Sequence, residues 1–343
     1  MTARIRTLVV DDSAFVRKIV REILSGSPDI EVVGVARDGE EALELVEQLR
    51  PDVITCDLIM PRLDGLGFVR KQMARRPLPI LILTASPQDG DSVIEALSAG
   101  AVDFVQKPSA LATHELLEIR QQLLEKVKAA ARAPIANLGD RPPAAPGIFS
   151  RHTLKMDVVV LGISTGGPQA LRYLLPQFPA DFPIPLAIVL HMPIGYTALF
   201  AEKLNEISRL EVREAKDGDV LRPGLALLAQ AGRHLLFRRT AANDVVAQLS
   251  VQPIDKIHRP SADVLFQSAS EIYGGRVLGV IMTGMGDDGK QGCAWIKAQG
   301  GSVITEAENS CVIYGMPRSV VEAGLSDAAI PLTTMAAAIL ERI

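Results

Sequence analysis

The sequence predicts an α/β protein made of two doubly wound parallel-sheet domains joined by a linker. Short apolar runs alternate with amphipathic helical patterns in two separate series. Between the series, residues 128–152 are rich in alanine, proline and glycine, a composition that buries too little apolar surface to fold alone. The 343 residues are enough for two domains with separate cores. We therefore expect a first domain at residues 1–125, a linker at 126–153 and a second domain at 154–343.

The first series contains five strand-like runs and five helix-like patterns, which is the content of one compact doubly wound domain. The strands are expected at residues 7–10, 31–36, 53–56, 80–84 and 103–105. The helices are expected to start near Ser13, Gly39, Gly65, Asp91 and Leu111. The second series continues to the end of the chain, with strands expected at 158–161, 186–190, 225–229 and 277–282. No internal repeat of fixed period is visible.

Composition narrows the class of protein. Lys+Arg 36 nearly balance Asp+Glu 40, so no basic face is large enough to suggest nucleic acid as a partner. No signal-peptide pattern follows Met1, and the longest apolar runs have strand length, so we expect a soluble, cytoplasmic, monomeric protein without membrane insertion. The cysteines Cys56, Cys293 and Cys311 lack paired spacing, so we expect them reduced and partly buried, without zinc.

Charged and polar residues follow four of the five strands of the first domain. Asp11 and Asp12 follow the first strand, Asp57 the third, Thr84 ends the fourth and Lys107 follows the fifth. Because the carboxyl ends of parallel strands meet at one edge, these residues converge. Three crowded carboxylates repel one another unless a hard cation lies between them, which predicts a Mg²⁺ site with Asp57 as phosphoryl acceptor and with the lysine and the threonine binding the phosphoryl oxygens. The alternative is a set of unrelated helix caps, turn residues and solvated charges.

Three segments of this domain resemble response-regulator receiver domains: residues 9–13, 57–65 and 104–108. The resemblance spans the whole first domain and implies a flavodoxin-like fold with an aspartyl phosphate on Asp57. It further implies Mg²⁺ bound by Asp12, Asp57 and the main-chain oxygen of Ile59, with Asp11 in support. It also implies a switch in which Thr84 moves toward the phosphate and Phe104 repacks inward.

A serine follows the first strand of the second domain. The sequence Gly162-Ile163-Ser164-Thr165-Gly166-Gly167-Pro168 joins an apolar strand to a helix pattern. Such a turn exposes a hydroxyl beside a helix N-terminus, where an oxyanion is stabilised, so Ser164 is a candidate nucleophile. The short Gly-x-Ser-x-Gly pattern also occurs by chance. A phosphate-binding loop and a simple helix N-cap are the alternatives.

A serine nucleophile needs a base and an acid that orients the base. His191 directly follows the strand at 186–190 and lies at the same sheet edge as Ser164 if the two strands are adjacent, so we predict it as the base. His234 and His258 are interpreted as structural. The strand at 277–282 is followed by Asp287 and Asp288, one of which is expected to hold the imidazole.

These segments, with residues 310–317, resemble the chemotaxis protein-glutamate methylesterase (CheB) family over nearly the full chain. The resemblance implies a Rossmann-like hydrolytic domain, with Asp288 as the orienting acid and the N–H groups of Thr165 and Met285 as the oxyanion hole. Gln230 and Ala231 replace an expected Pro-Gly pair, a departure that leaves the triad intact.

The resemblance implies a phosphorylation-regulated serine hydrolase that releases methanol from glutamyl methyl esters on chemoreceptors and deamidates specific receptor glutamines. It implies a sensor histidine kinase as phosphodonor, chemoreceptors as substrates and no cofactor for the ester hydrolysis. In the resting state the receiver domain is expected to cover the triad. Two other functions stay open: an output domain that binds a partner or nucleic acid without catalysis, and a nucleotide-binding output domain that uses the glycine loop.

Overall fold

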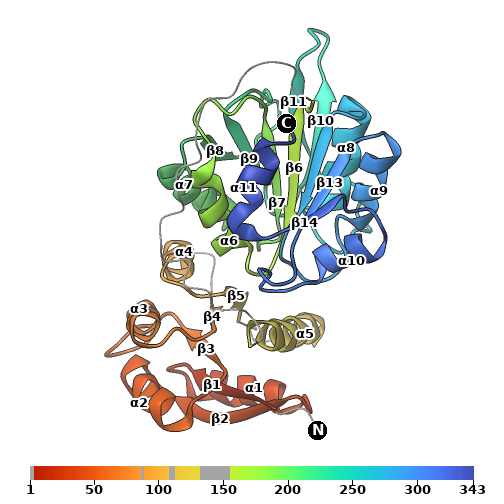
Figure 1. Cartoon of the computed structure of the whole chain (residues 1–343). Helices are drawn as coiled ribbons and strands as arrows, with labels where there is room; N and C mark the ends of the chain where they lie inside the picture. The colour runs from red at the N-terminus through yellow and green to blue at the C-terminus, as the bar shows by residue number, and fades with distance from the viewer. Residues whose placement is uncertain (1–3, 86–88, 108–112, 132–154) are drawn as a thin grey trace. The chain divides into compact units, whose positions relative to one another are not determined.

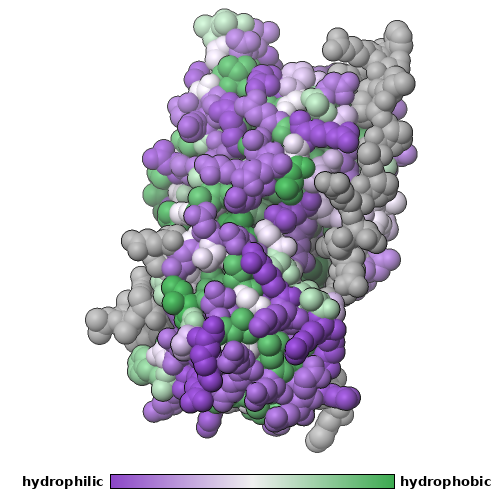
Figure 2. Space-filling model, turned by 90° about the vertical axis from the view of Figure 1, so that its left-hand side faces the viewer, coloured by the Kyte–Doolittle hydropathy of each residue, from purple (hydrophilic) through white to green (hydrophobic). Residues whose placement is uncertain are grey.

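The computed structural model describes residues 4–85, 89–107, 113–131 and 155–343. The chain divides into two compact units, Met1–Asn137 and Leu138–Ile343. Each is a parallel-sheet α/β unit (Figure 1), as the sequence predicts. No helix among the described residues is long and apolar enough to cross a membrane. Figure 2 shows hydrophilic side chains over most of the face it presents, with smaller hydrophobic groups between them.

The first unit is a five-stranded parallel sheet in the order β2-β1-β3-β4-β5. Its strands are β1 (Ile5–Val10), β2 (Ile30–Ala36), β3 (Val53–Asp57), β4 (Ile80–Thr84) and β5 (Asp103–Gln106). Its helices are α1 (Ala14–Ser25), α2 (Gly39–Leu49), α3 (Gly65–Arg75), α4 (Gly90–Ser98) and α5 (Thr113–Ala130). The strand order reverses between β1 and β3, which is where ligands bind in such sheets.

Local sequence explains these elements. Every residue of β3 and β4 is buried, as expected for strands covered on both faces. The side chains of Ser13, Asp38 and Asp64 accept hydrogen bonds from main-chain N–H groups and so cap α1, α2 and α3. At Gly65 a Cβ atom would lie 2.0 Å from the carbonyl oxygen of Asp57, so only glycine lets α3 begin this close to β3.

The helix α5 extends past the expected end of the first domain. The linker was expected from residue 126, but α5 continues through Ala130. The reason is burial: Val127 and Ala130 are at most 1% exposed, and the ammonium of Lys126 lies 2.9 Å from Asp103. The rest of the expected linker, residues 132–153, and the helix start expected near Leu111 lie outside the described residues.

The second unit is a seven-stranded parallel sheet in the order β14-β13-β12-β6-β7-β9-β8. The strands are β6 (Val158–Ile163), β7 (Leu186–Leu190), β8 (Glu211–Glu214), β9 (Leu225–Leu228), β12 (Val277–Ile281), β13 (Ser302–Glu306) and β14 (Ala328–Ile330). The helices are α6 (Gly167–Leu174), α7 (Thr197–Ile207), α8 (Ala262–Tyr273), α9 (Lys290–Ala298), α10 (Met316–Glu322) and α11 (Leu332–Leu340). Helices α6, α7 and α11 form one contacting group, and α8, α9 and α10 form another (Figure 1).

The sequence did not predict the antiparallel hairpin of β10 (His234–Arg239) and β11 (Val245–Ser250). It also did not predict β8, β13 and β14, which are three to five residues long; β8 and β13 carry polar residues, and β14 has only three residues. The hairpin packs against α8 and adds Leu235, Phe237 and Ala247 to the main core. The interpretation of His234 as a strand-entry residue is confirmed, since β10 begins there.

Candidate active site

Ser164 lies in the turn between β6 and α6. Its N–H donates to the carbonyl of Thr283 at 2.9 Å, and its own carbonyl accepts from the N–H of Gly167 at 2.7 Å. Gly166 has φ 80°, and a Cβ there would lie 2.5 Å from Val312. A glycine is therefore required for the turn to close under the serine. Ser164 remains half-buried, so its hydroxyl is held in place without being sealed off.

His191 ends the neighbouring strand. Ile163 and Leu190 are paired in the register of β6 and β7, and the N–H of His191 donates to the carbonyl of Ile163 at 3.1 Å. Ser164 and His191 are therefore the next residues on adjacent parallel strands, which are about 4.8 Å apart. The structure places them at the same sheet edge, as the sequence predicts.

Asp288 holds the imidazole of His191. Its Oδ2 lies 2.8 Å from Nε2 of His191. Both side chains are under a tenth exposed. Nδ1 of His191 is buried and has no hydrogen-bond partner among the described residues. With Nε2 bound to the carboxylate, Nδ1 is the ring nitrogen available to a serine hydroxyl.

The start of α8 supplies further donors to Asp288. The hydroxyl of Ser261 donates to Oδ1 at 2.7 Å, the N–H of Ala262 to Oδ2 at 2.7 Å and the N–H of Asp263 to Oδ1 at 3.1 Å. Burial acts to raise the pKa of Asp288, but the hydrogen bonds from His191, Ser261 and Ala262 outweigh it and hold this pKa well below its usual range. The carboxylate is therefore charged and fixed at neutral pH.

The choice between the two aspartates, which the residues alone leave open, is decided by these contacts. Asp287 is exposed and its carboxylate binds Lys290 at 2.9 Å. The side chain of Asp288 points the other way, into the buried cluster of donors. The structure thus brings together His191 and Asp288, not Asp287.

The loop after β12 lies against the nucleophile turn. The hydroxyl of Thr283 donates to the carbonyl of Thr165 at 2.9 Å, and a Cβ on Gly284 would lie 2.8 Å from the Cβ of Ser164. Within the ranges that the structure describes, the N–H groups of Thr165 and Met285 have no acceptor. Both are thus available to an oxyanion beside Ser164.

Sequence reasoning assigned no role in the site to two histidines. The ring of His258 stacks on that of His191, with centroids 4.1 Å apart and planes 20° apart. His234 is fully buried; its Nδ1 lies 3.3 Å from the N–H of Ser261 and its Nε2 3.1 Å from the carbonyl of Pro253. A neutral imidazole satisfies both contacts, and burial lowers the pKa of His234 accordingly. The one available signal was the run from His258 to Ser261 directly before a helix pattern.

A cavity of about 440 Å³ opens beside the loop that follows His191. Its lining includes Ile194, Glu214, Gln230, Ala231 and Arg233. Gln230 and Ala231 are the residues that replace the expected Pro-Gly pair. This departure therefore changes the wall of a neighbouring pocket and leaves the contacts of His191 unaffected.

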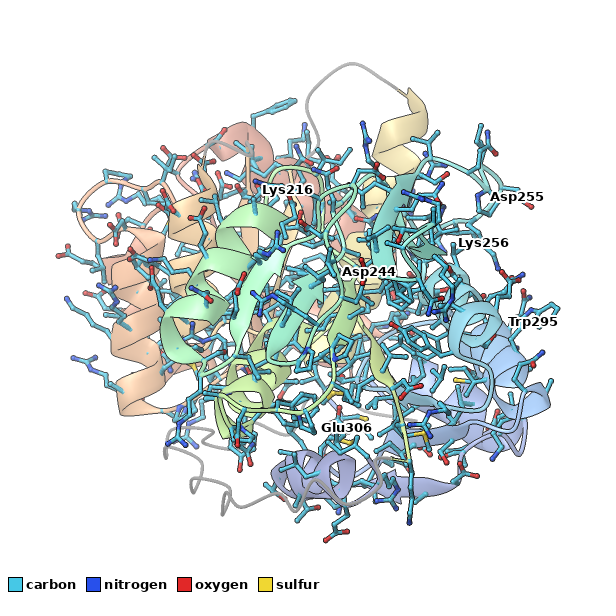
Figure 3. The ribbon with its side chains drawn as sticks, turned by 90° about the horizontal axis from the view of Figure 1, so that it is seen from above. Lys216, Asp244, Asp255, Lys256, Trp295 and Glu306 are labelled. Carbon is cyan, nitrogen blue, oxygen red and sulfur yellow. The ribbon has the colours of Figure 1, made fainter. Side chains whose placement is uncertain are left out.

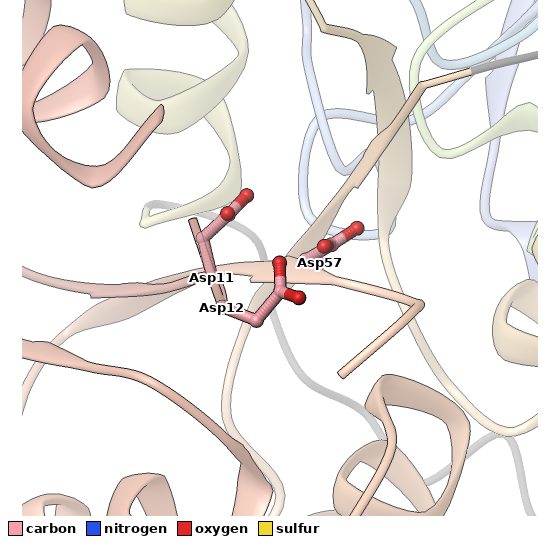
Figure 4. A group of neighbouring side chains, drawn as sticks. All are labelled: Asp11, Asp12 and Asp57. Carbon is pink, nitrogen blue, oxygen red and sulfur yellow. The ribbon is translucent and has the colours of Figure 1, made fainter. Parts of the chain in front are cut away.

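The acidic cluster predicted in the first unit is present at the switch point of its sheet. Carboxylate oxygens of Asp11, Asp12 and Asp57 lie within 4.8 Å of one another (Figure 4). The ammonium of Lys107 lies 2.7 Å from Asp11 and 2.8 Å from Asp57. Burial raises the pKa of Asp57 although Lys107 opposes this, and burial acts to lower the pKa of Lys107 although the two carboxylates raise it overall. Such an oxygen-only set fits a hard divalent cation.

Of the other two predicted switch residues, Thr84 is the last residue of β4 and Phe104 is the second residue of β5. Thr84 is 1% exposed and its hydroxyl donates to Asp89 at 3.3 Å. Phe104 is 2% exposed, and its carbonyl accepts from Lys126 at 2.8 Å. Their movement and a metal contact of the Ile59 main-chain oxygen stay predictions. All three cysteines are free and buried.

The fold and the two sites define a two-domain α/β signalling protein with an acidic site in one domain and a serine–histidine–aspartate site in the other. The CheB methylesterase family matches residues 159–339, and the response regulator receiver domain matches residues 7–119. The chain belongs to the CheB methylesterase family.

Comparison with individual relatives agrees with this family assignment. The chain is 48% identical over 97% of its length to protein-glutamate methylesterase/protein-glutamine glutaminase 5 of Myxococcus xanthus, of which it covers 96%. It is 40% identical over 97% of its length to the protein-glutamate methylesterase/protein-glutamine glutaminase of Pyrococcus horikoshii, of which it covers 92%. It is also similar to the crystal structure of the Thermotoga maritima CheB methylesterase catalytic domain, with 38% identity and a TM-score of 0.53, covering 55% of this chain and 99% of that one.

Proposed function

We propose that this chain demethylates glutamyl methyl esters on chemoreceptors, releases methanol and thereby provides sensory adaptation, with Ser164 as nucleophile. The observation that carries the catalytic assignment is the 2.8 Å contact between His191 and Asp288, one strand away from Ser164. An ordered imidazole and carboxylate beside a serine at a strand–helix turn is the arrangement that serine hydrolysis requires.

The contacts of His191 favour a specific route for the proton. Asp288 accepts the N–H of Nε2, so the lone pair of Nδ1 is free to take the proton from the Ser164 hydroxyl. The serine oxygen attacks the ester carbonyl, and the oxyanion accepts hydrogen bonds from the N–H groups of Thr165 and Met285. Collapse of this intermediate breaks the bond to the methoxy group, which leaves as methanol with the proton from Nδ1.

A γ-glutamyl ester of Ser164 remains after methanol leaves. His191 then takes a proton from water, the resulting hydroxide attacks the acyl carbonyl, and the serine oxygen leaves with the proton. The products are a free glutamate side chain and the original enzyme. A receptor glutamine undergoes the same sequence with ammonia as the first leaving group, which accounts for the glutaminase activity in the names of the relatives.

The first domain regulates this reaction through phosphorylation of Asp57 by a chemotaxis-type histidine kinase. The residues present suit the Mg²⁺ that receiver chemistry requires: Asp11, Asp12 and Asp57 provide three carboxylates within 4.8 Å. When bound, Mg²⁺ neutralises charge on the phosphoryl group during its transfer. Lys107 holds the acceptor carboxylate from the other side and binds a phosphoryl oxygen after transfer. Thr84 and Phe104 carry the resulting change.

We propose that the protein acts in the cytoplasm, where kinase and receptor signalling domains meet, and that it acts there as a monomer. The substrate enters as a protein helix whose ester side chain reaches Ser164. We propose that residues next to the ester contact the cavity lined by Ile194 and Arg233, because Ile194 lies three residues after His191.

Ser164→Ala tests the assignment. With methylated receptor as substrate, we expect the variant to lose methanol release by a factor of 10³ or more, on the order of losses for serine nucleophiles. Ser208→Ala is the matched control, because the Ser208 hydroxyl has no hydrogen-bond partner among the described residues. Methanol release by Ser164→Ala at the wild-type rate would refute Ser164 as the nucleophile and favour the alternative in which the glycine loop binds a nucleotide.

A further inference from the structure

His258 covers the ring of His191. The two imidazoles are 4.1 Å apart and tilted by 20°, which is face-to-face stacking. The residue His258 is exposed, whereas the side chain of His191 is 9% exposed. The outer histidine thus separates one face of the inner one from solvent.

The segment that carries His258 also holds Asp288. Three residues later, the hydroxyl of Ser261 and the first N–H groups of α8 bind that carboxylate. The carbonyl of Arg259 accepts the N–H of Gly232 at 3.0 Å, which anchors the segment to the loop before β10. Residues 258–263 therefore contact both members of the imidazole–carboxylate pair. Figure 3 shows the neighbouring Asp255 and Lys256 at the periphery of the domain.

We propose that His258 is a positioning residue for ester hydrolysis, which keeps the ring plane of His191 oriented so that Nδ1 faces Ser164. This rests on the proposed function, because it takes His191 as the base. The contact with Asp288 holds the ring at Nε2 and the bond to Cβ holds it at Cγ, so the freedom that remains is rotation about the line between these two ring atoms. A ring stacked on its face restrains that rotation, and small errors in the placement of a base reduce turnover strongly.

The charge of His258 suits this role. Burial of its ring lowers the pKa of His258, and so does the neighbouring His191. The negative charges of Asp288 and Asp287 oppose this shift. Its exposed edge keeps contact with water, which weakens all of these effects. The outcome is a neutral ring at neutral pH, which does not repel the positive charge that His191 gains during the reaction.

Replacement of His258 in the full-length protein tests the proposal. With a small phosphodonor, Mg²⁺ and methylated receptor, His258→Ala is expected to lower kcat about fivefold to tenfold, the range for loss of an aromatic pair, with KM within about twofold. His258→Phe keeps a flat ring without a titrating group and is expected to restore kcat to within about threefold of wild type. Ile257→Ala is the control on the same loop, since Ile257 is 94% exposed.

A second measurement does not depend on turnover. In NMR spectra, the ring current of residue 258 shifts the carbon-bound ring protons of His191, so these shifts persist in His258→Phe and are lost in His258→Ala. Wild-type kcat in the alanine variant, equal loss in the alanine and phenylalanine variants, or unchanged His191 shifts in the alanine variant would overturn the proposal. A wild-type protein that releases no methanol would instead refute the proposed function, whatever the NMR result.

Discussion

The same oxygen of Asp288, Oδ2, lies 2.8 Å from Nε2 of His191 and 2.7 Å from the main-chain nitrogen of Ala262. The carboxylate therefore joins the imidazole of His191 directly to the first turn of α8. Both donors direct an N–H at one acceptor, which determines the tautomer of the histidine. The orientation of the base thus depends on a helix start far from Ser164 in sequence.

Asp288→Asn is expected to lower kcat by about 10³- to 10⁴-fold, because an amide N–H₂ directed at His191 forces the wrong tautomer. Methanol release from methylated receptor is the measurement, with near-ultraviolet circular dichroism to confirm folding. Asp287→Asn is the control, since that side chain is exposed and binds Lys290, and its activity should stay within about twofold. Equal effects of the two variants would contradict the assignment.

Ser261→Ala removes the 2.7 Å hydrogen bond to Oδ1 of Asp288. A hydrogen bond to a buried charge contributes about 1.5–3 kcal/mol, so we expect the free energy of unfolding in urea to fall by that amount and kcat to fall as well. In the control Ser270→Ala, the lost hydroxyl donates, among the described residues, to the carbonyl of Gln267 within α8, and we expect a loss of less than about 1 kcal/mol. The reverse order of the two losses would argue against this role of Ser261.

Glu306 makes the stability of the second unit depend on pH. It is fully buried behind the loop after β12, where it accepts the N–H of Thr283 at 2.9 Å and the hydroxyl of Ser310 at 3.0 Å (Figure 3). Burial raises its pKa, although these two hydrogen bonds oppose the shift. The folded state thus retains this proton to higher pH than the unfolded state, so the stabilisation is complete below the unfolded pKa of about 4.3 and is lost as pH rises through the folded value.

Glu306→Gln is expected to remove this dependence, because the amide oxygen still accepts the N–H of Thr283, its N–H₂ takes the place of the O–H of the protonated acid, and the amide does not titrate. Urea unfolding across the mildly acidic range should show wild-type stability decreasing with rising pH relative to the variant. Parallel curves for the two proteins would show that Glu306 does not retain its proton.

Asp57→Asn is expected to abolish the stimulation of methanol release by a small phosphodonor and to leave basal release within about twofold. Chelation of Mg²⁺ should have the same effect on the wild type, because the cluster requires the cation only for phosphoryl transfer. Asp52→Asn, which alters an exposed aspartate that accepts the N–H of Arg6, is the control. Stimulation that survives in Asp57→Asn would show that another residue is the acceptor.

The sequence predicted those parts of the sites that follow directly from strands. Ser164 and His191 each follow a continuous apolar run, and parallel strands bring their carboxyl ends together, so their proximity could be inferred. The contacts of Ser261 and His258 could not be inferred in the same way. Both reach partners more than 25 residues away along the chain, across loops whose course no periodic pattern determines.

The same reason explains the missed hairpin. Its strands have only six residues each and show no regular alternation of polar and apolar residues, and β10 carries two arginines, so hydropathy gives a weak signal. β10 also packs against α8, which is a tertiary contact that hydropathy along the chain does not reveal.

The hairpin has a consequence for engineering. His234 opens β10 and pairs in register with Ser250, while its ring contacts the N–H of Ser261, so strand pairing is mechanically connected to the acid that orients the base. The tip at residues 241–244 is exposed, and exposed loop tips are the sites where inserted sequence is generally tolerated. A ligand-responsive module grafted at this tip would strain or relax the two strands when its ligand binds. It would thereby change turnover from a distance and leave the residues of the reaction centre unchanged.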